Sequence, residues 1–126
     1  MSCNALKTHM IEFIDDLSSI FTRKDDLNDL EMIKLALDVV SEEELMKQII
    51  SAFLPFKKQI SDRDLDFFKN NKNKIFVGID QKRIDYFDKK ITSAPADGGI
   101  SADDKEAIWA YFDVIIDLAE EYKKVN

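Results

Sequence analysis

Cysteine, histidine, glycine and proline are all scarce in this sequence, and their scarcity excludes several classes of structure and site. The chain of 126 residues has one cysteine, one histidine, three glycines and two prolines. Cys3 has no partner for an internal disulfide, which suits a reducing compartment. So few glycines and prolines leave little room for a β-sandwich with many turns or for a glycine-rich phosphate loop.

Long apolar runs are missing as well. No segment approaches the roughly 18 consecutive apolar residues that a membrane-spanning helix requires. Residues 1–7 lack the apolar core of a signal peptide. We therefore expect an intracellular protein of the cytoplasm or nucleus, with no membrane partner.

Basic residues are outnumbered by acidic ones, 18 against 25, and the formal net charge is −7. Proteins hold the phosphate backbone of nucleic acids mainly with lysine and arginine. The surface as a whole is therefore expected to repel nucleic acid, although a local basic strip remains compatible with this average.

Apolar residues recur at spacings of three and four along most of the chain, which is typical of amphipathic helices. The length fits one domain, and a chain of this size needs neither a metal nor a disulfide to fold. We predict a single all-α domain over residues 1–126, a compact bundle of five or six helices. The main predicted helices cover residues 4–21, 28–40, 42–53, 80–91 and 102–124.

Several local features refine this prediction. The helix at 28–40 is apolar around so much of its circumference that we expect it at the centre of the bundle. Ser41 followed by Glu44 is a capping box, which explains the acidic run at 42–44 without a catalytic role. Residues 70–74 read as a polar surface loop and residues 92–100 as the one long loop. The β-like run Ile75–Ile79 is interpreted as a loop or a short helical turn held in the core.

No residue pattern predicts a catalytic, cofactor or metal site. Cys3 and His9 are six positions apart, so they share a helical face poorly and cannot alone form a zinc site. The stretch around Asp97 resembles half of a calcium-binding loop, but Ser93 and Pro95 stand where carboxylate ligands belong. A carboxylate-based metal or enzymatic domain remains an alternative, because sequence does not show which acids are buried.

Two kinds of surface remain as candidates. Tyr86, Trp109 and Tyr111 are candidate protein-interface residues, because aromatic residues dominate interaction hot spots. For Trp109 the favoured interpretation is a core residue. The second candidate is a nucleic-acid surface made by Lys69, Lys72 and Lys74 among aromatic residues. Its structural alternative is a solvated loop between two buried aromatic anchors.

Four short motifs follow one another in a characteristic order. They are Asp16-Leu17-x-x-Ile20-Phe21, Leu54-Pro55-Phe56, Ile60-Ser61-x-x-Asp64-x-Asp66-Phe67-Phe68 and Ile108-Trp109-x-Tyr111-Phe112-x-x-Ile115. Together they resemble small helical proteins of unknown function encoded by large DNA viruses of algae and amoebae. The resemblance implies a virus-encoded protein of the infected host cell or the virion, and it brings no catalytic residue.

The sequence thus favours a non-enzymatic protein-interaction module, such as an adaptor or a regulatory or structural subunit. Its partner is expected to be another protein or a second copy of the chain, and no cofactor is expected. The nucleic-acid and carboxylate-based alternatives stay open at this point.

Overall fold

The computed structural model describes residues 2–76 and 79–125, except for the side chains of residues 2, 74 and 75. Within these ranges the chain is helical and has no strand, so the all-α prediction is confirmed. In the described part of the chain, six helices have eleven residues or more, and α4 has only five. The helices are α1 Ser2–Ile20, α2 Lys24–Val39, α3 Glu42–Phe53, α4 Lys57–Ser61, α5 Leu65–Ile75, α6 Gln81–Thr92 and α7 Ala102–Val125, with 3₁₀ turns at Leu54–Phe56 and Pro95–Asp97.

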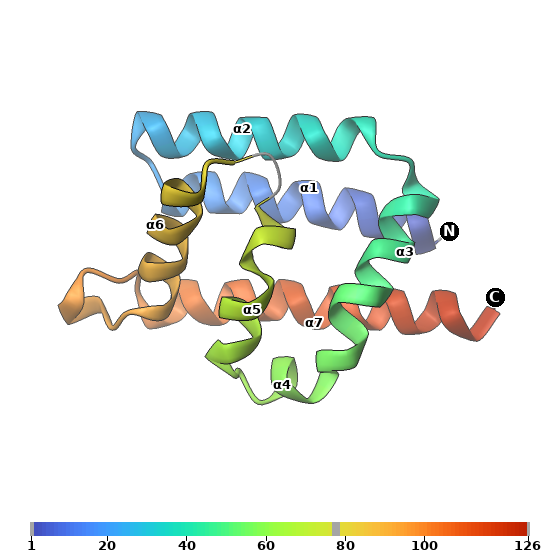
Figure 1. Ribbon diagram of the computed structural model, residues 1–126. Coiled ribbons are helices and arrows are strands. Elements are labelled where there is room, and N and C mark those ends of the chain that lie inside the picture. Colours follow the sequence, from blue (N-terminus) through green and yellow to red (C-terminus); the bar gives the residue numbers. More distant parts are fainter. Residues whose placement is uncertain (1, 77–78, 126) are drawn as a thin grey trace.

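The long helices α1, α2 and α7 lie side by side, and shorter helices cross them (Figure 1). Helix α1 packs between α2 and α7, and it runs antiparallel to both. Helices α3, α5 and α6 run across this row, and α3 contacts both α1 and α7. No helix of the described ranges is both long and apolar enough to cross a bilayer.

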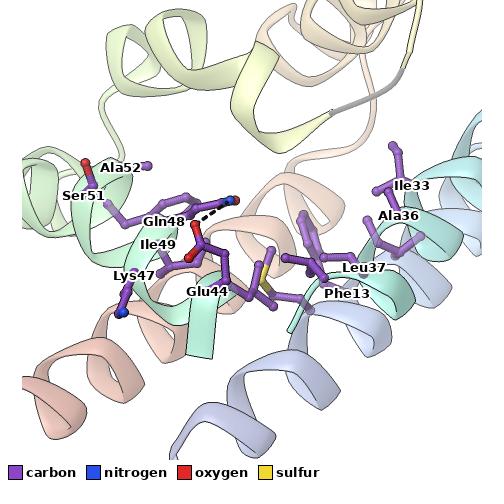
Figure 2. A pocket seen from close by; sticks show the side chains of 15 residues that line it. Phe13, Ile33, Ala36, Leu37, Glu44, Lys47, Gln48, Ile49, Ser51 and Ala52 are labelled. Atoms are coloured by element: carbon purple, nitrogen blue, oxygen red, sulfur yellow. Dashed lines mark hydrogen bonds between the residues drawn. The ribbon is translucent and has the colours of Figure 1, made fainter. Parts of the chain in front are cut away.

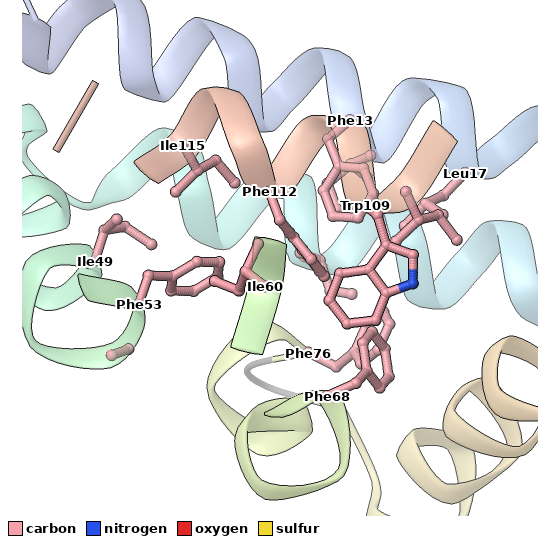
Figure 3. Close-up of a cluster of buried hydrophobic side chains, with 14 of the residues drawn as sticks. Phe13, Leu17, Ile49, Phe53, Ile60, Phe68, Phe76, Trp109, Phe112 and Ile115 are labelled. Carbon is pink, nitrogen blue, oxygen red and sulfur yellow. The ribbon is translucent and has the colours of Figure 1, made fainter. Parts of the chain in front are cut away.

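The core is built around Phe112 of α7, which is fully buried. Its ring makes edge-to-face contacts with Phe13, Phe53 and Phe67, at centroid distances of 5.7, 5.6 and 5.8 Å. Figure 3 shows Phe13 and Phe53 with Phe112 in this cluster. Each such pair adds about 0.5–1.5 kcal/mol beyond the area it buries. Because the four rings come from α7, α1, α3 and α5, this cluster joins the row of long helices to the helices that cross it.

The helix starts follow the local chemistry of the sequence. Ser41 accepts a hydrogen bond from the backbone amide of Glu44 at 3.1 Å, and Ser101 accepts one from Asp104 at the same distance. Both caps satisfy amides that the first turn of a helix leaves free. The long loop at 92–100 is present and contains the second 3₁₀ turn, and the Ile100 amide closes it by donating to the Lys90 carbonyl at 2.9 Å.

The prediction of a polar loop at 70–74 is wrong, because α5 continues to Ile75. Its polar residues have partners that suit a helix. Asn71 is buried and donates to the Phe67 carbonyl at 2.9 Å, and Lys72 pairs with Asp85 and Asp88 of α6. The run Ile75–Ile79 therefore begins as the end of α5 and continues into the buried Phe76, while residues 77 and 78 lie outside the described part.

The prediction that the helix at 28–40 lies at the centre of the bundle is also wrong. Helix α2 lies at the edge of the row, where it packs on α1. Leu30, Ile33 and Leu37 face the core, but the other apolar residues of this helix do not. Part of the apolar circumference of α2 is therefore left exposed, because no neighbouring element among the described residues covers it.

Candidate functional site

The outer face of α2 carries an exposed apolar strip, which we define as Met32, Leu35 and Val39. Their exposed fractions are 54%, 56% and 86%. Positions 32, 35 and 39 are three and four apart, so they share one face of the helix. An aliphatic strip of this kind is unusual on a surface that is otherwise strongly charged, and contiguous apolar patches often mark interaction sites.

A groove of about 620 Å³ lies beside this strip, between α1, α2 and α3. Figure 2 shows residues of α2 facing residues of α3 across it. Most of its lining is apolar, and the floor is formed by core side chains. The lining residues are Met10, Phe13, Ile14, Ile33, Ala36, Leu37, Val40, Glu44, Leu45, Lys47, Gln48, Ile49, Ser51, Ala52 and Phe53.

The strip and the groove form one continuous apolar surface. Ala36 and Val40 line the groove, and Ala36 is four positions from Met32 and three from Val39. Side chains at these spacings are neighbours on a helix surface. We call the combination of the strip and the groove the α2 surface.

Among the polar residues of the groove, Glu44, Lys47 and Gln48 contact one another or a near neighbour. Gln48 donates from Nε2 to Oε1 of Glu44 at 3.5 Å, as Figure 2 shows, and Lys47 lies 3.6 Å from Glu43. Glu44, Lys47, Gln48 and Ser51 are all exposed, and they lie on α3 along the border of the groove. The groove therefore has an apolar floor and a polar border, as protein-binding surfaces do.

The three aromatic residues predicted for a protein interface lie elsewhere. Trp109 is buried against Phe67 and Phe112, so it is a core residue rather than an interface residue. Tyr111 is half-buried, its ring lies 4.8 Å from that of His9, and its hydroxyl donates to Asp16. Burial and this hydrogen bond raise the pKa of Tyr111 to about 12.

Tyr86 belongs to a polar cluster that joins α6 to α2. Its hydroxyl donates to Asp26 at 3.2 Å, and the guanidinium of Arg83 lies 4.6 Å from its ring centroid. Arg83 also pairs with Asp26 and, at 2.6 Å, with Asp29. Asp26 is only 1% exposed, so the cluster is a partly buried set of polar contacts that holds the two helices together.

The three lysines of the nucleic-acid hypothesis differ in their surroundings. Lys72 is engaged by Asp85 at 2.8 Å and by Asp88 at 3.0 Å. The hydrogen bonds that Lys72 donates to these two carboxylates raise its pKa. Lys69 is exposed, and the side chain of Lys74 lies outside the described residues. The structure thus gives one exposed lysine and one lysine already held by two acids.

The candidate groups for chemistry do not converge. His9 donates from Nε2 to the carbonyl of Tyr111 at 3.0 Å, and burial raises the pKa of the Cys3 thiol. No group of three or more metal-ligating side chains occurs among the residues that the structure describes. Asp97 lies in the exposed 3₁₀ turn of the long loop.

Sequence reasoning missed the α2 surface although its signal was visible. Met32, Leu35 and Val39 widen the apolar face of the helix, and this width was assigned to a central position in the bundle. Comparisons with family models, with curated proteins and with solved structures found no match to this chain.

Proposed function

We propose that this protein is a non-enzymatic protein-interaction module that binds its partner on the α2 surface. The observation that carries the proposal is the exposed apolar strip of α2, which continues into an apolar groove. The strip is not needed to complete the core, because Leu30, Ile33 and Leu37 already fill the inner face of the same helix. Covering it with a partner would remove aliphatic surface from water.

Site-specific photocrosslinking in the native cell tests this proposal. A photoreactive phenylalanine analogue at position 35 should form a protein crosslink, whereas the same analogue at position 114 should not. Val114 is a matched control, because it is an exposed aliphatic residue on a helix away from the α2 surface. Adding Val39→Asp should remove the crosslink at position 35 while the far-ultraviolet circular dichroism stays unchanged. Equal crosslinking at both positions would contradict the proposal.

The other sequence-based hypotheses stay predictions. A nucleic-acid role would rest on Lys69 and Lys74, since Lys72 is held by two carboxylates. Binding of single-stranded DNA at low salt that is lost in Lys69→Ala would support it. From the resemblance to helical proteins of large DNA viruses, we propose that the interaction takes place inside an infected cell or in a virion.

A further inference from the structure

We infer that the occupant of the α2 surface is a basic amphipathic helix of another protein, rather than a second copy of this chain. The inference rests on the proposed function and adds the chemistry of the partner. Three features carry it: the acidic border of the surface, its shape, and the charge of the chain as a whole.

Acidic side chains lie on both sides of the α2 surface. On α2, Glu31 and Asp38 are exposed, four and three positions from Leu35, so both are its neighbours on the helix surface. Across the groove, Glu44 lines the border and Glu43 lies beside it. Among the described residues, no ion pair involves Glu31, Asp38 or Glu44.

Three basic residues lie near this border. Lys7 donates to the backbone carbonyls of Asp38 and Val40 at 3.2 and 2.7 Å, and the other two form ion pairs. Lys34 lies 2.9 Å from Asp15, and Lys47 lies 3.6 Å from Glu43. The hydrogen bond to Asp15 and its charge raise the pKa of Lys34, and the charges of Glu31 and Asp38 add smaller effects in the same direction. The acids Glu31, Asp38 and Glu44 still outnumber Lys7, so the local field is negative. Lysine or arginine residues that flank an apolar stripe would complement it.

The shape suits a helix. The strip from position 32 to 39 is about 10 Å long at 1.5 Å per residue, which is two turns. A helix that docks in a groove anchors itself with apolar side chains at positions i, i+3, i+4 and i+7, which cover about the same length. The groove of about 620 Å³ beside the strip has room for several such side chains.

A second copy fits less well. In a symmetric dimer through α2, the same patch meets itself, so Glu31 and Asp38 of one protomer face acidic residues of its partner. Each chain also has a formal net charge of −7. Like charges placed opposite each other oppose association, whereas a basic helix gains from the same arrangement.

Fluorescence anisotropy with designed helical peptides tests the inference. The basic probe is a labelled peptide of roughly 18 leucine and lysine residues, with leucines at i, i+3, i+4 and i+7. The acidic probe replaces every lysine with glutamate, and a scrambled leucine–lysine peptide controls for charge without a stripe. We expect the basic stripe peptide to bind at least about tenfold more tightly than either control. Its affinity should fall several-fold between roughly 0.05 and 0.5 M salt.

Variants of the protein locate the binding. Leu35→Asp should weaken the binding of the basic peptide by about tenfold or more, while Val114→Asp should leave this binding unchanged. The double variant Glu31→Gln/Asp38→Gln should reduce the preference for the basic over the acidic peptide. Light scattering across a concentration series accompanies each variant.

Each result has a defined meaning. Equal binding of the basic and acidic stripe peptides, both lost in Leu35→Asp, would overturn the charge inference but keep the α2 surface as a binding site. A dimer that Leu35→Asp dissociates would overturn the inference in favour of a second copy and would still leave an interaction module. Equal binding to Leu35→Asp and Val114→Asp, or no binding of any peptide by a monomeric chain, would overturn the inference at this surface. The crosslinking at position 35 would then decide the proposed function separately.

Discussion

The buried carboxylate of Asp26 is the residue-level feature that most affects the attachment of α6 to α2. Its side chain is 1% exposed and its charge is balanced by Arg83, with a further hydrogen bond from Tyr86. Removing one partner of a buried pair is costly because the other charge stays buried without compensation. The two members of this pair are not equivalent, since Arg83 is 23% exposed and keeps Asp29 as a second partner.

We therefore expect Arg83→Met to lower the free energy of unfolding by about 3–5 kcal/mol. Asp26→Asn should cost only about 1–2 kcal/mol, because the asparagine keeps an acceptor for Tyr86 and Arg83 keeps Asp29. Urea unfolding followed by circular dichroism gives both values. An equal cost for the two variants would contradict this account of the cluster.

Tyr111 makes the stability depend on pH in the alkaline range. Burial, and then the hydrogen bond to Asp16, raise its pKa from 10.0 to about 12. The folded state holds this proton more tightly than the unfolded state does. The resulting stabilisation is fully present below pH 10.0 and is lost as the pH rises toward about 12.

The variant Tyr111→Phe isolates this effect. The wild-type chain should lose stability more steeply than the variant between pH 10 and 12, as measured by urea unfolding at each pH. The absorbance of the phenolate, titrated in both proteins, should show that the variant lacks a tyrosine with a pKa of about 12. Parallel stability curves for the two proteins would mean that Tyr111 titrates alike in the folded and unfolded states.

At the scale of elements, α2 separates the role of apolar residues in folding from their role in binding. Leu30 is 1% exposed and faces the core, whereas Leu35 is 56% exposed on the other side of the same helix. The same substitution at both sites therefore compares a buried and an exposed leucine in one element.

Leu30→Ala should lower the free energy of unfolding by about 2–5 kcal/mol, because it removes buried methyl groups and leaves a cavity. Leu35→Ala should change the free energy of unfolding by less than about 0.5 kcal/mol, but it should weaken the binding of the basic peptide. Urea unfolding and the anisotropy assay together check both statements. A large loss of stability in Leu35→Ala would show that the strip belongs to the core.

The sequence predicts the starts of α3 and α7 well, because caps depend on neighbouring residues only. The start of α2 is predicted four residues too late, since this helix begins at Lys24 without a side-chain cap. Ser41 and Ser101 cap α3 and α7 as their local patterns indicate. The extension of α5 through residues 70–74 depends on α6, since Asp85 and Asp88 of that helix hold Lys72. A polar run alone does not reveal such partners.

The candidate site was harder to predict for a related reason. Periodicity identifies which positions of α2 are apolar, but it does not show which neighbouring helix covers them. The wide apolar circumference therefore predicts a central helix, whereas the structure covers only the face with Ile33 and Leu37. The choice of Tyr86, Trp109 and Tyr111 rested on residue type, while the α2 surface is largely aliphatic.

At the scale of the whole molecule, the excess of acidic residues acts on folding and binding in opposite directions. The chain has a formal net charge of −7, and exposed acids cluster at the start of α3 and along α2. Their mutual repulsion opposes the compact state. The ion pairs around Arg83 and Lys72 are partly buried, so salt screens them less than it screens the exposed acids.

Raising sodium chloride from roughly 0.02 to 0.5 M should therefore stabilise the free protein, by up to about 1 kcal/mol. The same salt should weaken the binding of the basic peptide, because it screens the attraction between that peptide and the acidic border. Thermal unfolding and anisotropy, measured in the same buffers, compare the two effects. Potassium chloride at equal ionic strength should act alike, since screening depends on ionic strength alone. A loss of stability with added salt would mean that the ion pairs outweigh the repulsion among exposed acids, and the negative field at the α2 surface would then be weaker than its acidic border suggests.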